Sequence, residues 1–74
     1  MIASQCRMAR AALGLGVREL AALAKVSPNT IARLERGEDL RERTIDDIRA
    51  ALETAGVEFI PENGGGPGVR LRKG

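Results

Sequence analysis

The sequence predicts a mainly α fold with four to five short helices and a short C-terminal β-hairpin or strand tail. Apolar residues recur every three or four positions from residue 2 to residue 55, which is the spacing of one face of a helix. Glycines and one Ser-Pro pair interrupt this pattern where helices commonly end or begin. From residue 57 the apolar residues alternate with other residues, which is typical of strands.

The length of 74 residues allows one small domain. Its core has to be aliphatic, because Phe59 is the only aromatic residue and His, Trp and Tyr are absent. The single cysteine excludes an intrachain disulfide and, without His, leaves no basis for a Cys/His metal site. A chain this short, with no His and no plausible nucleophile, is not expected to be an enzyme or to need a cofactor.

No segment has the pattern of a membrane span. The apolar runs are far shorter than the ~20 residues that a span requires, and the N-terminus lacks the pattern of a secretory signal. We therefore expect a cytoplasmic protein with no membrane partner. The chain leaves no room for a separate ligand domain, so we also expect no small-molecule ligand.

The first predicted helix ends at a glycine, and the second ends at a short turn. Four apolar residues at spacings of four, three and four define the inner face of the first helix: Ile2, Cys6, Ala9 and Leu13. Gly14 is expected to end it. The second helix spans Val17 to Ala24 and is too short to be stable without packing, so we expect Leu20, Leu23 and Ala24 to face inward.

The clearest local signal surrounds Ser27 and Pro28. A serine hydroxyl accepts hydrogen bonds from the free N–H groups of a first helical turn, and proline suits the first helical position because its missing N–H is not needed there. The sequence therefore predicts a third helix that begins at Pro28, buries Ile31 and Leu34, and ends at Gly37.

A charged connector, residues 38–43 with Leu40 as its apolar anchor, leads to the fourth predicted helix. We expect Thr44 to cap this helix, with Asp46 and Asp47 in the first turn, where carboxylates interact favourably with the helix dipole. Gly56 is expected to end it. The predicted inner face contains Ile45, Ile48, Leu52 and Ala55.

Two short strands are predicted at residues 57–60 and 69–72, joined by a glycine-rich loop at residues 61–68. The loop lacks the Gly-Lys-Ser/Thr ending of a phosphate-binding loop, which favours a simple turn. An isolated two-stranded hairpin is only marginally stable in water, so the strands must pack on the fourth helix or pair with a second chain. The expected contacts are Ile48, Leu52, Val57, Phe59, Val69 and Leu71.

The small net charge of +2 conceals an uneven distribution. Residues 1–37 contain six Lys and Arg against two acids, residues 38–62 contain three against eight, and residues 63–74 contain three bases and no acid. The three segments therefore carry +4, −5 and +3. This asymmetry is compatible either with a basic face directed at a polyanion or with ordinary solvated surface charge.

Residues 20–37 contain the pattern L-A-x-x-x-x-V-S-x-x-T-I-x-x-L-E-x-G. Two short helices with this pattern, between a preceding and a following helix, resemble the helix-turn-helix domain of the lambda-repressor-like regulators, also called the xenobiotic-response-element type. The resemblance extends over residues 2–72, and the C-terminal part is similar to a strand-forming tail of some small bacterial members. It implies a four-to-five-helix domain that binds double-stranded DNA and regulates transcription.

The resemblance also implies roles for particular residues. Helix 28–36 would lie in the major groove, with Pro28, Asn29 and Arg33 toward the bases. Asn29 would bond to adenine, and Arg33 would donate two N–H groups to guanine. Contacts to phosphates, which fix the register without reading the sequence, are expected from Arg10, Gly16, Val17, Arg18, Lys25, Thr30 and Arg36.

Four positions depart from the family pattern and keep a second function open. Val17 replaces a frequent glutamine, Gly16 replaces a frequent Ser or Thr cap, and Lys25 replaces a glycine of the turn. Pro28 removes one possible base-reading side chain. The main interpretation is a sequence-specific regulator, expected to be a repressor. The alternative is a protein-interaction module, such as an antiactivator that binds another regulator instead of DNA.

The family commonly binds paired half-sites about one helical turn apart, so we expect a homodimer. The chain then divides into a DNA-binding unit, residues 1–56, and a β tail, residues 57–74, that forms the dimer contact. Cys6 allows two interpretations, a redox switch or a core residue. Its position on the apolar face of the first helix favours a buried, inert cysteine.

Overall fold

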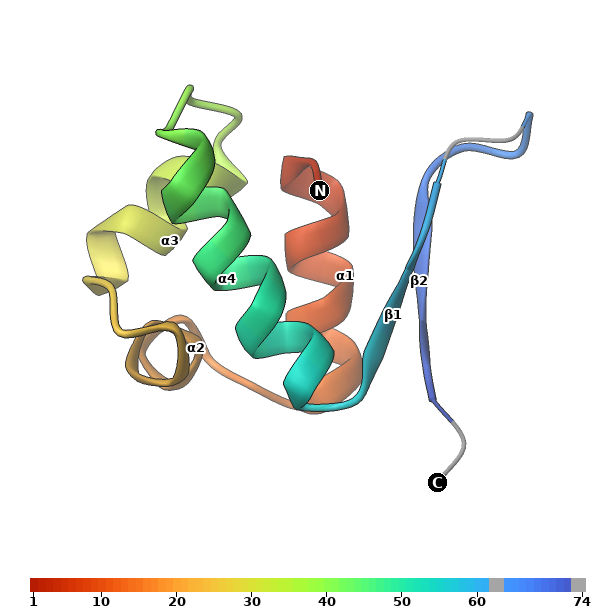
Figure 1. Ribbon diagram of the computed structural model, residues 1–74, viewed down its shortest axis with the longest axis horizontal. Helices are drawn as coiled ribbons and strands as arrows, with labels where there is room; N and C mark the ends of the chain where they lie inside the picture. The colour runs from red at the N-terminus through yellow and green to blue at the C-terminus, as the bar shows by residue number, and fades with distance from the viewer. Residues whose placement is uncertain (62–63, 73–74) are drawn as a thin grey trace.

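The computed structural model describes residues 1–61 and 64–72, in which four helices pack together and a β-hairpin lies beside them (Figure 1). The elements in chain order are α1 Ala3–Leu13, α2 Val17–Ala24, α3 Pro28–Glu35, α4 Glu42–Thr54, β1 Val57–Ile60 and β2 Gly68–Leu71. The prediction of a mainly helical fold with a C-terminal hairpin is confirmed. No helix in the described ranges is long and apolar enough to cross a membrane.

α1 and α2 both end at a residue in the left-handed conformation, which turns the chain away from the helix axis. At Gly14 φ is 69°, and the following N–H donates to the Arg10 carbonyl at 2.9 Å. At Lys25 φ is 59°, and the following N–H donates to the Ala21 carbonyl at 3.0 Å. Lys25 is the only non-glycine residue with positive φ in the described part of the chain, and this conformation costs about 1 kcal/mol that glycine would avoid.

α3 begins at Pro28, where the sequence predicts, and ends at Glu35, one residue before the predicted end at Arg36. The Ser27 hydroxyl accepts a hydrogen bond from the Thr30 N–H at 3.2 Å, and Pro28 occupies the first helical position. The Ser27 and Thr30 hydroxyls also lie 2.9 Å apart and share a hydrogen bond. Beyond the other end of the helix, Gly37 has a φ of 85°, which ends the helical path.

α4 begins at Glu42, three residues earlier than a cap at Thr44 implies, so the prediction of Thr44 as its cap was wrong. The residue before the helix is Arg41, whose carbonyl accepts the first intrahelical hydrogen bond at 3.1 Å. Asp46 and Asp47 therefore lie beyond the first turn, where Glu42 is the acidic residue. Glu and Arg are both good helix formers, so the helix includes the end of the predicted connector.

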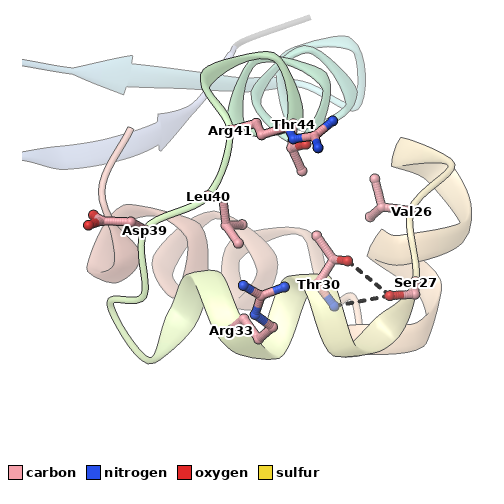
Figure 2. Close-up of a pocket in the computed structure, with 8 residues that line it drawn as sticks. All are labelled: Val26, Ser27, Thr30, Arg33, Asp39, Leu40, Arg41 and Thr44. Carbon is pink, nitrogen blue, oxygen red and sulfur yellow. Dashed lines mark hydrogen bonds between the residues drawn. The ribbon is translucent and has the colours of Figure 1, made fainter.

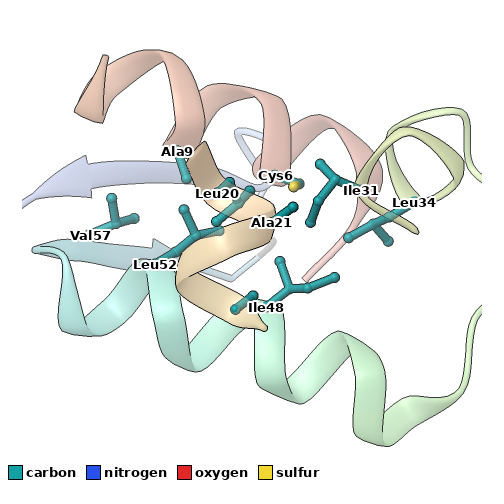
Figure 3. Close-up of a cluster of buried hydrophobic side chains, with 10 residues drawn as sticks. Cys6, Ala9, Leu20, Ala21, Ile31, Leu34, Ile48, Leu52 and Val57 are labelled. Atoms are coloured by element: carbon teal, nitrogen blue, oxygen red, sulfur yellow. The ribbon is translucent and has the colours of Figure 1, made fainter. Parts of the chain in front are cut away.

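Buried aliphatic side chains from all four helices and β1 form one core (Figure 3). Its members are Cys6, Ala9, Leu20, Ala21, Ala24, Ile31, Leu34, Ile48, Leu52 and Val57. Three residues predicted to face inward do not: Leu23 and Ile2 are 53% and 51% exposed, and Ala55 is exposed at the end of α4. On α2 the buried arc is centred between Leu20 and Ala21, and Leu23 points about 100° away from that centre.

The hairpin closes within one chain, with Val57 of β1 opposite Leu71 of β2. β2 begins at Gly68, one residue earlier than predicted, and residues 62 and 63 of the predicted loop lie outside the described residues. Phe59 and Val69 pack against the core, whereas Leu71 is 51% exposed. Three of the expected tail contacts are buried inside a single chain and are not exposed to a second copy: Ile48, Leu52 and Val57.

Gln5 joins the hairpin to α1, a role that the sequence analysis did not predict. Its side chain is buried, and its Nε2 donates to the carbonyls of Ile60 and Gly68, both at 3.1 Å. Its Oε1 accepts a hydrogen bond from the Ile2 N–H at 3.0 Å. Because β2 packs on α1 while β1 packs on α4, the hairpin is supported by two helices and not by the fourth helix alone.

Candidate nucleic-acid interface

α2 and α3 pack against each other through small and aliphatic side chains. Leu20 and Ala21 of α2 and Ile31 of α3 are each at most 1% exposed. The left-handed Lys25 and the Ser27 cap form the turn between the two helices. This geometry places one face of α3 on the core and leaves the other face open to solvent (Figure 1).

The solvent face of α3 is polar and basic. Asn29, Arg33 and Arg36 follow spacings of four and three residues, so they lie along one stripe of the helix. The buried side chains of α3 lie on the opposite face. Asn29 is exposed, and the side chains of Arg33 and Arg36 are 43% and 59% exposed. Pro28 is also exposed, at the N-terminal tip of α3. Two of the three residues predicted to read bases, Asn29 and Arg33, therefore share one accessible stripe, and Pro28 lies at the tip of the helix outside that stripe.

A groove of about 430 Å³ lies between α3 and the beginning of α4 (Figure 2). Ser27, Thr30 and Arg33 line it on one side, and Arg41 and Thr44 line it on the other. Hydroxyl and guanidinium donors of this kind are suited to phosphate oxygens. The sequence analysis did not predict Arg41, because its proximity to α3 depends on the path of the connector between α3 and α4.

An ion pair joins α1 to the end of α3. Arg10 donates from Nε and Nη2 to the two carboxylate oxygens of Glu35, each at 2.9 Å, and the Cys6 thiol donates to the same carboxylate at 3.4 Å. We call Cys6, Arg10 and Glu35 the inner cluster. Arg10 was predicted to contact phosphate, but its remaining nitrogen, Nη1, donates to the Leu15 carbonyl at 3.2 Å. All three guanidinium nitrogens of Arg10 are therefore engaged within the protein.

The inner cluster shifts the pKa values of its members. Burial opposes the charge on Glu35, yet the hydrogen bonds from Arg10 and Cys6 and the charges of Arg10 and Arg7 lower the pKa of Glu35 overall. The pKa of the Cys6 thiol rises to about 12, first because the thiol is buried and then because Glu35 is negative. A thiol with this pKa is protonated and unreactive near neutral pH, which supports the core interpretation of Cys6.

Glu38 pairs with both arginines of the α3 stripe. Its Oε1 accepts from Arg33 Nε at 3.1 Å, and its Oε2 accepts from Arg36 Nε at 3.0 Å and from Arg36 Nη2 at 2.7 Å. Hydrogen bonds from Arg36 and then Arg33 lower the pKa of Glu38. We call Arg33, Arg36 and Glu38 the outer cluster, since each side chain is at least 43% exposed.

The remaining predicted phosphate contacts lie around α2. Arg18 and Lys25 are exposed, and Val17 is half-buried at the first position of the helix. Gly16 precedes the helix, and its N–H donates to the Glu19 carboxylate at 2.8 Å. The Gly16 N–H is thus occupied within α2, which leaves Arg18 and Lys25 as the exposed cations of this region.

Two helices that pack across a tight turn, between α1 and α4, define a helix-turn-helix protein of the lambda-repressor-like kind. A family model described as a helix-turn-helix domain matches residues 2–59, and the chain belongs to this family. The match covers all four helices and most of β1. A search among curated proteins found no match. Membership identifies the chain, in coarse terms, as a DNA-binding regulator of a typically non-enzymatic family.

Proposed function

We propose that the protein is a sequence-specific transcription regulator that binds double-stranded DNA through α3 and represses the adjacent genes. The observation that carries the proposal is the stripe of Asn29, Arg33 and Arg36 on the solvent face of α3. A helix of this kind fits the major groove, where all four base pairs present different donors and acceptors. A domain bound over a promoter excludes the polymerase, so repression is the simplest regulatory outcome.

The residues at the solvent face of α3 have distinct proposed roles. Asn29 exchanges two hydrogen bonds with adenine, and Arg33 donates two to O6 and N7 of guanine. Each of these pairs discriminates against a wrong base by about 1–3 kcal/mol. Pro28, at the tip of the helix, offers an apolar contact of the kind that a thymine methyl group accepts.

Phosphate contacts hold the domain in register on the duplex. We assign them to Arg18, Lys25, Thr30, Arg36 and the start of α2 at Val17, and we add Arg41 because it shares the groove with Thr30 and Arg33. Gly16 is left out, because its N–H already donates to the Glu19 carboxylate. Arg10 is left out of this set, because its guanidinium is engaged by Glu35 and Leu15. Arg10 supports binding only indirectly, by holding α1 on α3.

Selection from a random duplex library at moderate salt tests the proposal, and failure to enrich any sequence would contradict it. Arg33→Ala should relax the preference at one base position, whereas Arg36→Ala should weaken binding to the selected sequence without changing any base preference and reduce the salt slope of that complex by about 0.9. Arg49→Ala is the matched control, since Arg49 is also paired with a glutamate and is 45% exposed on α4. It should change neither quantity.

We further propose that two copies bind paired half-sites and associate through the hairpin. Leu71 of β2 is 51% exposed, and Phe59 and Val69 are only partly buried, so the hairpin presents apolar surface. Size-exclusion chromatography with light scattering should give a dimer that Leu71→Ser weakens. A wild-type protein that stays monomeric at high concentration would contradict this part of the proposal.

A protein-interaction module remains the second candidate, and the exposure of Leu23 favours it. Leu23 is 53% exposed and lines a groove of about 390 Å³ together with Ala50 and Ala51 of α4. Pull-down of a regulatory protein that Leu23→Ser abolishes, combined with no salt-dependent duplex binding, would favour this function. Enrichment of a DNA sequence by the wild type, retained in Leu23→Ser, would argue against it.

A further inference from the structure

Glu38 engages the two arginines of the α3 stripe in different ways. Arg33 donates to it through Nε alone, at 3.1 Å, which leaves the edge formed by Nη1 and Nη2 without a partner among the described residues. Arg36 donates through both Nε and Nη2, at 3.0 and 2.7 Å, so one whole edge of its guanidinium is occupied. The edge that Arg33 keeps open is a fork suited to O6 and N7 of guanine.

The backbone holds Glu38 in this position. Gly37, with a φ of 85°, reverses the chain after α3, and its N–H donates to the Leu34 carbonyl at 2.9 Å. The Glu38 N–H then donates to the carbonyl of Arg33 at 3.1 Å, which completes a Schellman motif. Because its own N–H is bonded to Arg33, Glu38 is fixed beside the last turn of the helix, and its carboxylate meets both arginines before any ligand arrives.

We propose that Glu38 is a positioning residue that determines specificity: it presents Arg33 to guanine and withholds Arg36 from non-specific phosphate contact. The proposal rests on the DNA-binding function proposed above. Ordering a long arginine side chain opposes binding, and Glu38 restricts Arg33 before the duplex arrives. Glu38 thereby lowers the cost of the Arg33–guanine contact, which carries sequence information.

Glu38 has the opposite effect on Arg36, because it disfavours the contact of this arginine with DNA. Arg36 reaches a phosphate only after giving up two hydrogen bonds to Glu38, and the carboxylate itself repels the DNA backbone. Non-specific affinity depends on phosphate contacts, so Glu38 weakens it. Specificity is the ratio of the two affinities, and Glu38 increases this ratio by disfavouring the wrong sequences as well as by favouring the right one.

The test compares five full-length proteins: wild type, Arg33→Ala, Glu38→Gln, Glu38→Asp and Glu53→Gln. Binding of each protein is measured to three duplexes. The first is the selected sequence, the second is that sequence changed at the base whose preference Arg33→Ala loses, and the third is an unrelated sequence. Glu53→Gln is the matched control, because Glu53 is also paired with an arginine and is 46% exposed, on α4. Far-UV circular dichroism and thermal unfolding check that each variant folds.

Glu38→Gln should lower the discrimination at that base at least about threefold. It should also tighten binding to the unrelated duplex more than Glu53→Gln does and steepen the salt slope by about 0.9, the value of one added phosphate contact. Glu38→Asp keeps the charge but is one methylene shorter, so it should lose discrimination too, since it cannot reach both arginines in the same geometry.

Wild-type discrimination in Glu38→Gln would overturn the proposal. Wild-type discrimination in Glu38→Asp, with loss in Glu38→Gln, would assign the effect to charge alone and would also overturn it. If the wild type selects no sequence, or Arg33→Ala relaxes no base, the DNA-reading function itself fails and this inference fails with it. If Arg33→Ala relaxes one base and Glu38→Gln does not, only the inference about Glu38 fails.

Discussion

Two glutamates three residues apart at the end of α3 have opposite surroundings. The Glu35 side chain is 10% exposed and pairs with Arg10, whose Nε and Nη2 each lie 2.9 Å from a carboxylate oxygen. The Glu38 side chain is 43% exposed and pairs with Arg33 and Arg36 at the surface. The same arginine–glutamate chemistry therefore positions α3 against α1 at one site and orients two arginines on the proposed DNA-binding surface at the other.

Burial, more than the ionic contact itself, determines what each of these ion pairs does. Removing one partner of a pair that is mostly withdrawn from water leaves a charge without compensation, so such a change destabilises the fold. An exposed pair is screened by water and salt, and its arginines can exchange a carboxylate for a phosphate. The inner cluster is thus expected to govern folding, and the outer cluster is expected to govern binding.

The largest expected effect tests this division directly. Glu35→Gln should lower the free energy of unfolding by about 2 kcal/mol, because Arg10 then stays largely buried without a counter-charge. In a chain of this size such a loss corresponds to a fall in Tm of roughly 10 °C. Thermal unfolding followed by circular dichroism measures it. Glu38→Gln and Glu53→Gln should leave Tm unchanged, and equal losses in all three variants would break the comparison.

The carboxylate of Glu35 should make stability depend on pH. The pKa of Glu35 is lower in the folded protein than in the unfolded chain, so its contribution is fully present above the unfolded pKa of about 4.3 and is lost as the pH falls through the folded pKa. Urea unfolding from pH 7 to pH 2 should show this loss in the wild type. Glu35→Gln should lack that component. Parallel pH profiles for the two proteins would contradict the assignment.

The buried Gln5 side chain should stabilise the hairpin against α1. Gln5→Ala removes the donor to the carbonyls of Ile60 and Gly68, so we expect a loss of about 1–2 kcal/mol. Hydrogen exchange should accelerate in β1 and β2 while α2 and α3 stay protected. Ser4→Ala, the neighbouring change, serves as the control. Unchanged exchange in the hairpin would show that Gln5 does not hold it.

Replacement of Lys25 should change stability and DNA binding in opposite directions. Lys25→Gly relieves the left-handed strain at φ 59° and should raise the free energy of unfolding by about 0.5–1 kcal/mol. The same change removes an exposed cation beside α3, so duplex binding should weaken equally for all sequences. Chemical denaturation and duplex titration measure the two effects. A loss of stability, or a change in base preference, would contradict this assignment.

Much of α3 was predictable from local sequence. The start of α3 at Ser27 and Pro28 and its end near Gly37 follow from capping chemistry within a few residues, and the confirmed boundaries reflect that. Asn29 and Arg33 share a face because of helical periodicity alone. Thr44 shows the limit of this reasoning, since a good capping residue does not start a helix when the residues before it are also good helix formers.

The pairing of charges was not predictable in the same way. Arg10 looked like one more exposed cation of the basic half, but it lies against Glu35, 25 residues away in the sequence. Gln5 binds carbonyls 55 and 63 residues away, and no spacing rule anticipates such contacts. Even the nearby Glu38 required the chain reversal at Gly37 before its two arginine partners could be identified.

Local sequence was enough to predict the four helices, the cap of α3, the hairpin and the face of α3 that carries Asn29 and Arg33, because hydrogen bonding and φ preferences act over a few neighbouring residues. The tertiary structure decided which charges are engaged inside the protein and which stay open to a ligand. It did so because the free energy of a charge depends on burial and on partners from distant segments. For this reason Arg10 became part of the scaffold, while one edge of Arg33 has no partner among residues 1–61 and 64–72.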